Sequence, residues 1–118
     1  MIEQAPSNPL FSVVITAYNK GAHIASTIQS VLDQSFADFE VIIVDDGSTD
    51  NTRSIVSSFV DARIRSIHQP HSGLPACARN KGISCATGRF IALLDGDDLW
   101  TKEKLARCKA AFDEDPAV

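Results

Sequence analysis

Four short apolar runs, each followed by a segment of helical periodicity, limit this chain to a small set of folds. The runs are rich in β-branched and aliphatic residues, which predicts strands, and the segments between them repeat apolar residues at helical spacing. Strands are expected at 11–18, 39–44, 63–68 and 89–94, and helices at about 24–34 and 74–84. Two further helices are expected, one around 55–60 after a cap at Ser48 or Asp50, and one around 105–112. This alternation is typical of an α/β fold with a mostly parallel four-stranded sheet flanked by helices.

The runs differ in the burial that they predict. Phe90–Leu94 is continuously apolar, which predicts a strand buried on both faces, whereas the run at 63–68 alternates and is expected nearer a sheet edge. Thr101 stands where an N-cap of the last helix is expected. The inner face of that helix would carry Leu105, Cys108 and Phe112.

Composition is that of a small globular domain or a piece of one. The chain has 118 residues, 44% of them apolar and 22% charged, which is enough to bury one core. Its net charge of −4 argues against non-specific nucleic-acid binding, which needs a basic surface. No apolar run reaches the roughly 18 residues of a membrane span, and residues 1–9 resemble no signal peptide. We therefore expect a cytoplasmic domain over 10–118 behind a lead-in of residues 1–9.

Polar and acidic residues gather in the turns that directly follow predicted strands. The first strand ends in Thr16, Ala17 and Tyr18, the second is followed by Asp45 and Asp46, and the fourth by Asp95-Gly96-Asp97-Asp98. The carboxyl ends of parallel strands meet at one edge, where open α/β sheets bind their ligands. The sequence therefore predicts a site at this edge.

Three of these carboxylates crowd into the turn at residues 95–98. At about 5 Å and an effective dielectric of about 20, each pair repels by roughly 3 kcal/mol, so a cation or solvent must offset the charge. Oxygen ligands without a neighbouring His or Cys favour Mg²⁺ or Mn²⁺, and magnesium commonly binds together with substrate phosphates. Gly96 allows close approach or an unusual φ between Asp95 and Asp97. From the residues alone, a plain polar surface turn stays open as the alternative.

Two further features fit a ligand that carries phosphates. Arg79 is a fixed positive charge that can bind phosphate through two nitrogens, and Asp46 can accept hydrogen bonds from a base or ribose. Neither a phosphate-binding Gly-x-x-x-x-Gly-Lys-Ser/Thr loop nor a Gly-x-Gly-x-x-Gly dinucleotide motif is present. A solvated helix charge at Arg79 and a simple turn at Asp45-Asp46 remain the alternatives.

Five motifs in this order resemble the N-terminal half of the family 2 glycosyltransferases, which have the GT-A fold. They are Val13-Val-Ile-Thr-Ala-Tyr-Asn19, Asp33-Gln-Ser-Phe36, Val44-Asp-Asp-Gly-Ser-Thr-Asp50, Ala78-Arg-Asn-Lys-Gly82 and Leu94-Asp-Gly-Asp-Asp98. The resemblance covers roughly residues 11–113. It implies a Rossmann-like domain that binds a nucleotide-diphospho-sugar donor, most often UDP-linked, with Mn²⁺ or Mg²⁺.

Carried over residue by residue, the resemblance assigns a role to each motif. Thr16, Ala17 and Tyr18 would line the base and ribose, and Asp46, supported by Asp45, would bond the base. Arg79 would lie near the diphosphate. Asp97 would bind the metal with Asp95 assisting at the metal or ribose, and Asp98 would lie at the donor sugar or beside the metal.

The resemblance also implies the reaction and its limits. The family is similar to inverting transferases, in which a carboxylate base activates an acceptor hydroxyl on a saccharide or lipid-linked saccharide. That base is expected beyond Val118, so we expect these residues to be the donor-binding part of a longer enzyme, inactive alone. The full-length protein would be cytoplasmic or peripheral at the inner face of the membrane. An exposed sheet edge would also allow a homodimer.

Three other functional classes are left open by the sequence. A non-catalytic nucleotide-binding module would keep the pocket without the chemistry. A receiver-type phosphoacceptor domain would need its acidic pair after the first strand rather than at Asp45-Asp46. A haloacid-dehalogenase-type phosphatase would need its Asp-x-Asp after the first strand, and a Thr or Val where Leu99 stands.

Overall fold

A computed structural model describes residues 8–114 of the chain, in which four strands alternate with four helices as the sequence predicts. Most of the predicted lead-in at 1–9 lies outside the described residues. The elements are β1 (Phe11–Ala17), α1 (Ile24–Leu32), β2 (Phe39–Asp45), α2 (Thr52–Ser58), β3 (Ile64–His68), α3 (Pro75–Cys85), β4 (Phe90–Asp95) and α4 (Lys104–Glu114). Among these residues no helix is both long and apolar enough to cross a bilayer.

The strands form one parallel sheet in the order β3-β2-β1-β4, which confirms the expected parallel α/β architecture. β1 lies at the centre, where Ala17 pairs with Asp45 of β2 and Thr16 pairs with Asp95 of β4. This register brings the ends of three strands level with one another. The predicted convergence of their polar turns at one edge is therefore confirmed.

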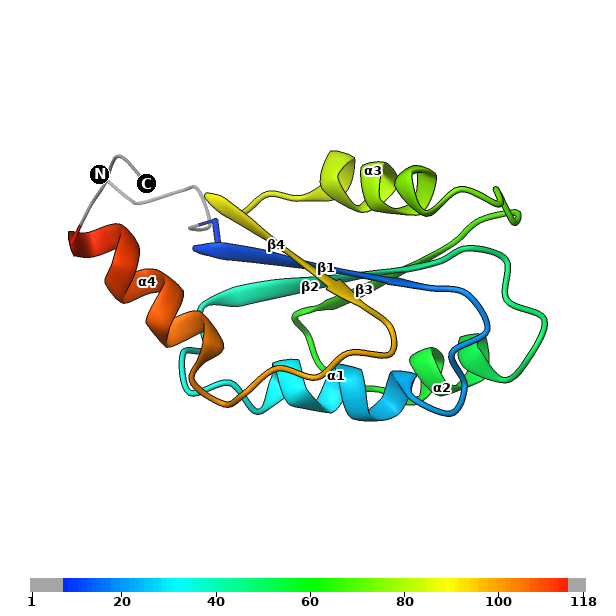
Figure 1. Ribbon diagram of the computed structural model, residues 1–118, viewed down its shortest axis with the longest axis horizontal. Helices are drawn as coiled ribbons and strands as arrows, with labels where there is room; N and C mark the ends of the chain where they lie inside the picture. The colour runs from blue at the N-terminus through cyan, green and yellow to red at the C-terminus, as the bar shows by residue number, and fades with distance from the viewer. Residues whose placement is uncertain (1–7, 115–118) are drawn as a thin grey trace, which may run out of the picture.

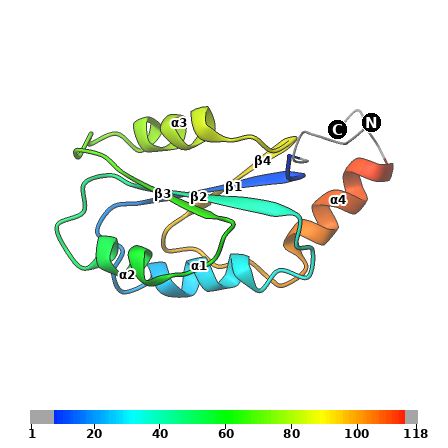
Figure 2. The ribbon, with the colours of Figure 1, turned by 180° about the vertical axis from the view of Figure 1, so that it is seen from behind.

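Helices cover both faces of the sheet (Figures 1 and 2). α3 lies on one face, while α1 and α2 lie on the other, and α4 lies at the end of the sheet opposite the loops that follow β1 and β2. Because side chains alternate along a strand, Val13 and Ile15 enter the larger core beneath the sheet with Ile28 of α1. Ile42 and Val44 of β2 point the other way and pack against α3.

A glycine sets how closely α3 approaches the sheet. A Cβ at Gly82 would lie 2.3 Å from Val14 Cγ1 and 3.3 Å from Val44 Cγ2, so no larger residue fits without moving the helix. This close approach holds α3 over the carboxyl half of β1. Arg79, one turn earlier on α3, is thereby kept beside the strand ends.

The prediction that β4 is buried on both faces is wrong. β4 pairs only with β1 and forms an edge of the sheet, and Ile91 and Leu93 are 43% and 48% exposed. The reason is lateral position: α3 packs mainly over β1 and β2 and leaves Ile91 and Leu93 of β4 exposed. Only the opposite face of the strand is covered, where Leu94 is buried. The expectation that the third strand lies at an edge is confirmed.

The start of α4 also differs from the prediction. The helix begins at Lys104, so Thr101 is not its N-cap. Gln34, at the end of α1, accepts a hydrogen bond from the Leu105 N–H at 2.9 Å and donates one to the Thr101 carbonyl at 2.6 Å. A side chain distant in sequence thus satisfies the first turn. The predicted inner face is confirmed, since Phe112 stacks on Phe90 with ring centroids 4.0 Å apart.

Candidate active site

The loops that follow β1 and β2 are tied to each other through Asn19. This residue has a left-handed φ of 51°, and its side-chain oxygen accepts hydrogen bonds from the Thr49 and Asp50 N–H groups at 2.7 and 3.3 Å. Its own N–H donates to Ser48 Oγ at 2.9 Å. The backbone on either side, at Tyr18 and Lys20, is thereby fixed at the edge of the sheet.

Asp45 lies beneath the site rather than in it. It is 2% exposed, accepts a hydrogen bond from the Ser48 N–H at 3.2 Å, and its Oδ2 lies 3.2 Å from His68 Nδ1. It also accepts a hydrogen bond from the Ser48 hydroxyl. These contacts tie Asp45 to the turn after β2 and to the end of β3.

Asp46 holds the loop between β3 and α3. Its carboxylate accepts hydrogen bonds from Gln69 Nε2 at 2.7 Å and from the Ser72 N–H and hydroxyl, both at 3.0 Å. His71 Nδ1 donates to the Asp46 carbonyl at 2.9 Å. Burial acts to raise the pKa of Asp46, but these hydrogen bonds outweigh it and hold the pKa below its ordinary value. The carboxylate is therefore ionised and fixed in direction.

Tyr18 forms an aromatic wall with a residue that sequence patterns did not single out. Its ring stacks on that of His71 with centroids 4.0 Å apart and an angle of 23° between the planes. Tyr18 remains 39% exposed, so part of its surface is open to a ligand. A flat, half-exposed aromatic surface beside a fixed carboxylate suits a planar heterocycle.

A pocket of about 520 Å³ joins these features, within the range of small-molecule sites. Seven of the predicted site residues line it: Thr16, Ala17, Tyr18, Asp46, Arg79, Asp95 and Asp97. Asp98 instead lines a neighbouring hollow of about 450 Å³, which shares Arg79 and Asp95 with the first. Of the predicted residues, only Asp45 lines neither hollow.

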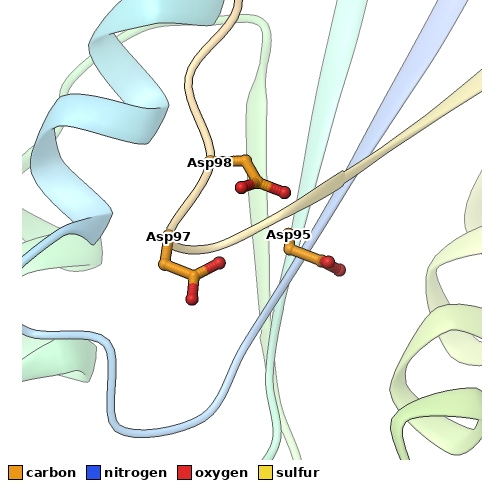
Figure 3. Close-up of side chains that lie close together, drawn as sticks. All are labelled: Asp95, Asp97 and Asp98. Carbon is orange, nitrogen blue, oxygen red and sulfur yellow. The ribbon is translucent and has the colours of Figure 1, made fainter.

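The acidic turn at the end of β4 brings three carboxylates together (Figure 3), and each of them lines at least one of the two hollows. One oxygen from each of Asp95, Asp97 and Asp98 lies within 4.8 Å of the others, and all three residues are exposed. The close-approach role of Gly96 is confirmed, because a Cβ there would lie 2.9 Å from Ala17 Cβ and 3.0 Å from the Thr16 carbonyl. Three exposed carboxylate oxygens are a donor set that fits a hard divalent cation.

Lys20 is a charged residue of the pocket that sequence patterns placed only in a turn. Its Nζ lies 3.2 Å from Asp97 Oδ2, and this contact holds the pKa of Asp97 below its ordinary value. His71, Gly73 and Leu74 also line the pocket without having been predicted. Lys20 could have been predicted from the sequence, because it lies in the turn that follows the first strand. No such pattern marks the loop at 71–74, which precedes a helix.

The sequence model of glycosyl transferase family 2 matches residues 12–118, most of the chain. The chain belongs to this family. Four of the five motifs contribute residues to the pocket, whereas the motif at residues 33–36 lies outside it. The family is one of enzymes that transfer glycosyl groups.

Two curated relatives illustrate the functions found among similar proteins. The chain is 46% identical over 101 residues to TuaG of Bacillus subtilis strain 168, which is named as a teichuronic acid biosynthesis glycosyltransferase. It is 43% identical over 96 residues to the Escherichia coli UDP-Glc:alpha-D-GlcNAc-diphosphoundecaprenol beta-1,3-glucosyltransferase WfgD. These matches cover 84% and 81% of the chain but only 40% and 38% of the relatives, so the chain spans about two fifths of their length.

Solved structures agree with the fold. Staphylococcus aureus TarS 1-349 in complex with UDP-GlcNAc matches 88% of the chain with a TM-score of 0.84 at 35% identity, over 31% of its own length. The mannosyltransferase PcManGT from Pyrobaculum calidifontis, in complex with GDP-Man and Mn²⁺, matches 95% of the chain with a TM-score of 0.84 at 27% identity, over 34% of its length. The fold of the family 2 chain is therefore that of the GT-A glycosyltransferases.

Proposed function

We propose that residues 10–118 form the donor-binding part of a metal-dependent glycosyltransferase. Its donor is a nucleoside diphosphate sugar, and UDP is the nucleotide that we propose. The observation that carries the proposal is the single pocket that joins the Tyr18 ring, the Asp46 carboxylate, the Arg79 guanidinium and the acidic turn. These groups suit, in order, a base, its polar edge, a diphosphate and a metal. The complexes of TarS with UDP-GlcNAc and of PcManGT with GDP-Man and Mn²⁺ support it.

In this proposal each end of the pocket binds one part of the donor. Thr16, Ala17 and Tyr18 contact the base and ribose, and the ionised Asp46 accepts a hydrogen bond from the base. Arg79 pairs with the diphosphate, since a guanidinium can bind two phosphate oxygens at once. Asp98 faces the second hollow, where the sugar would extend.

Asp97 and Asp95 would hold the divalent cation, with Mn²⁺ and Mg²⁺ both suited to their oxygen atoms. Bound there, such an ion supplies Lewis-acid stabilisation of the negative charge that develops on the departing nucleoside diphosphate. The carboxylates themselves would offset the charge of the ion and hold it in the pocket that Arg79 also lines. Their exposure leaves them open to a ligand that enters from solvent.

The reaction that fits this half-site is transfer with inversion. An acceptor hydroxyl attacks the anomeric carbon, the bond to the diphosphate breaks, and a carboxylate base takes the hydroxyl proton. We assign that base and the acceptor site to protein beyond these 118 residues, and expect negligible transfer by the chain alone. The name of WfgD suggests an acceptor of the lipid-linked saccharide class, and that of TuaG a cell-envelope polysaccharide.

Calorimetry with UDP, with and without Mn²⁺, tests this function on the 118-residue chain. We expect UDP to bind, with an affinity at least about tenfold higher when Mn²⁺ is present, because each 1.4 kcal/mol of added binding energy gives a factor of ten. Asp97→Ala should abolish the dependence on metal. Asp113→Ala, which removes an exposed carboxylate of α4, is the matched control and should bind as the wild type does.

Two results would contradict the proposal. A folded sample that binds no UDP in either condition would exclude a nucleotide pocket. An Asp97→Ala variant with unchanged metal dependence would exclude Asp97 as the ligand and direct attention to Asp95 and Asp98.

A further inference from the structure

The backbone of Lys20 is fixed by hydrogen bonds, whereas its side chain is partly exposed to solvent. Its N–H donates to Thr52 Oγ1 at 2.8 Å, and its carbonyl accepts hydrogen bonds from the His23 and Ile24 N–H groups at 2.9 and 2.8 Å. The ammonium, on a four-carbon stem, reaches Asp97 with the side chain still 38% exposed. The Lys20 ammonium can therefore exchange partners without any movement of the backbone.

The partner that Lys20 holds is the carboxylate assigned to the metal. Among residues 8–114, the ion pair with Lys20 is the one that the acidic turn makes. The carboxylates of Asp95 and Asp98 lie within 4.8 Å of that of Asp97 and repel it, and the charge of His23 also acts on Asp97. Lys20 also lines the pocket that contains Arg79. The ammonium thus contacts the acidic turn and lines the same pocket as the guanidinium assigned to the diphosphate.

We propose that Lys20 is a displaceable counter-cation that couples nucleotide binding to metal binding. When no ligand is bound, the Lys20 ammonium pairs with Asp97. When the divalent cation and the nucleoside diphosphate bind, the cation takes the Asp97 carboxylate and the ammonium pairs with the diphosphate instead. The inference rests on the proposed function and adds Lys20 to it, as a residue that pairs either with Asp97 or with the diphosphate.

Simple electrostatics supports the exchange. The Lys20 ammonium and a divalent cation compete for the same Asp97 oxygen, and they repel each other at contact distance. When the cation binds alone, the Lys20–Asp97 ion pair is therefore lost and the ammonium gains no new partner. When a nucleoside diphosphate enters with the cation, the released ammonium gains phosphate oxygens, for which lysine acts as a compact point charge. Each ligand then strengthens the binding of the other, as thermodynamic linkage requires.

The test measures binding rather than turnover. Free Mn²⁺ is followed by its electron paramagnetic resonance signal during titration of the 118-residue chain without nucleotide, and UDP is titrated separately by calorimetry at saturating Mn²⁺. Lys20→Met should bind Mn²⁺ alone about three- to tenfold more tightly, as expected for removal of one exposed competing charge. The same variant should bind UDP in the presence of Mn²⁺ about three- to tenfold more weakly.

Two further variants make the result specific. Lys109→Met removes a lysine of similar exposure, 41% against 38%, that also pairs with an aspartate but lies on α4, and it should leave both affinities unchanged. Lys20→Arg keeps the charge and should bind Mn²⁺ alone as weakly as the wild type. Thermal unfolding of each variant checks that it is folded, which the exposure of the Lys20 side chain leads us to expect.

The outcomes separate this inference from the proposed function. Equal or weaker Mn²⁺ binding by Lys20→Met would overturn the competition, and unchanged UDP affinity would overturn the transfer to phosphate. In both cases wild-type binding of UDP with Mn²⁺ would leave the proposed function standing. A wild-type chain that binds no UDP would overturn the proposed function and this inference with it.

Discussion

Asp46 combines two tasks in one side chain. It lines the pocket, yet hydrogen bonds from Gln69 and Ser72 already direct its carboxylate, and the residue is only 5% exposed. A pocket residue that also ties down a neighbouring loop resists rearrangement, because any rotation of the carboxylate would break those bonds. Its charge is therefore part of the fold as well as of the site.

We predict that Asp46 makes stability depend on pH in the acid range. Because its pKa is lowered in the folded chain, its contribution is fully present above the unfolded value near 3.8 and is lost as pH falls through the folded value. At pH 7, Asp46→Asn should reduce the free energy of unfolding by about 1–3 kcal/mol, the usual loss for a charged hydrogen-bonded group. The difference from wild type should shrink as the pH falls below 3.8.

Urea unfolding at pH 7, 4.5 and 3.5 measures this difference. The exposed Asp38, changed to Asn, serves as the control and should show no comparable change. A gap between wild type and Asp46→Asn that stays constant over this range would contradict the assignment of a lowered pKa.

At the scale of elements, hydrogen bonds of the Gln34 side chain connect the first and last helices. The side chain is 6% exposed and bonds the Ser30 carbonyl at 3.1 Å, the Thr101 carbonyl at 2.6 Å and the Leu105 N–H at 2.9 Å. One amide thus satisfies groups at the end of α1, in the loop after β4 and in the first turn of α4. The Gln in the Asp33-Gln-Ser-Phe36 motif has a structural rather than a catalytic role.

We predict that Gln34→Ala destabilises the chain by about 1–3 kcal/mol, because the buried Leu105 N–H loses its hydrogen-bond partner and the bond to the Thr101 carbonyl is also lost. Chemical denaturation monitored by circular dichroism measures the change. Gln29→Ala, on the exposed face of the same helix, removes only a bond to Asp33 and should change stability by less than about 0.5 kcal/mol. Equal effects of the two substitutions would argue against the role of Gln34.

At the scale of the whole molecule, β4 is an edge strand with exposed apolar side chains. The strand pairs on one side only, and its exposed Ile91 and Leu93 lie in a stretch, Phe90–Leu94, without a charged residue. Sheet edges that face solvent usually carry charges or prolines that prevent strand pairing between molecules. The stretch Phe90–Leu94 has neither, since the charged residues Arg89 and Asp95 stand only at its two ends.

We therefore predict that the 118-residue chain self-associates through β4 as its concentration rises. Leu93→Lys should reduce the association, because a charge on an edge strand disfavours pairing with a second strand. Light scattering over a range of concentrations measures the effect. Val60→Lys is the matched control: Val60 is 97% exposed but lies away from β4, and its replacement should leave the association unchanged. A monomer at every concentration would contradict the prediction.

The sequence by itself determined the order and type of the elements, the parallel sheet, and the edge at which the site lies. Strand and helix periods are local properties, and the polar turns after β1, β2 and β4 had to meet once those strands were parallel neighbours. Most predicted boundaries lie within two residues of the observed ones for the same reason. Of the predicted site residues, only Asp45 lies outside both hollows.

Tertiary structure alone decided which residues from distant segments meet. The edge position of β4, the capping of α4 by Gln34, the Tyr18–His71 stack and the Lys20–Asp97 ion pair all depend on lateral placement and loop path, which no local pattern encodes. An apolar run has the same appearance whether a helix covers one of its faces or both. The physical reason is that periodicity reports how a segment folds, whereas contacts at the site depend on what packs beside it.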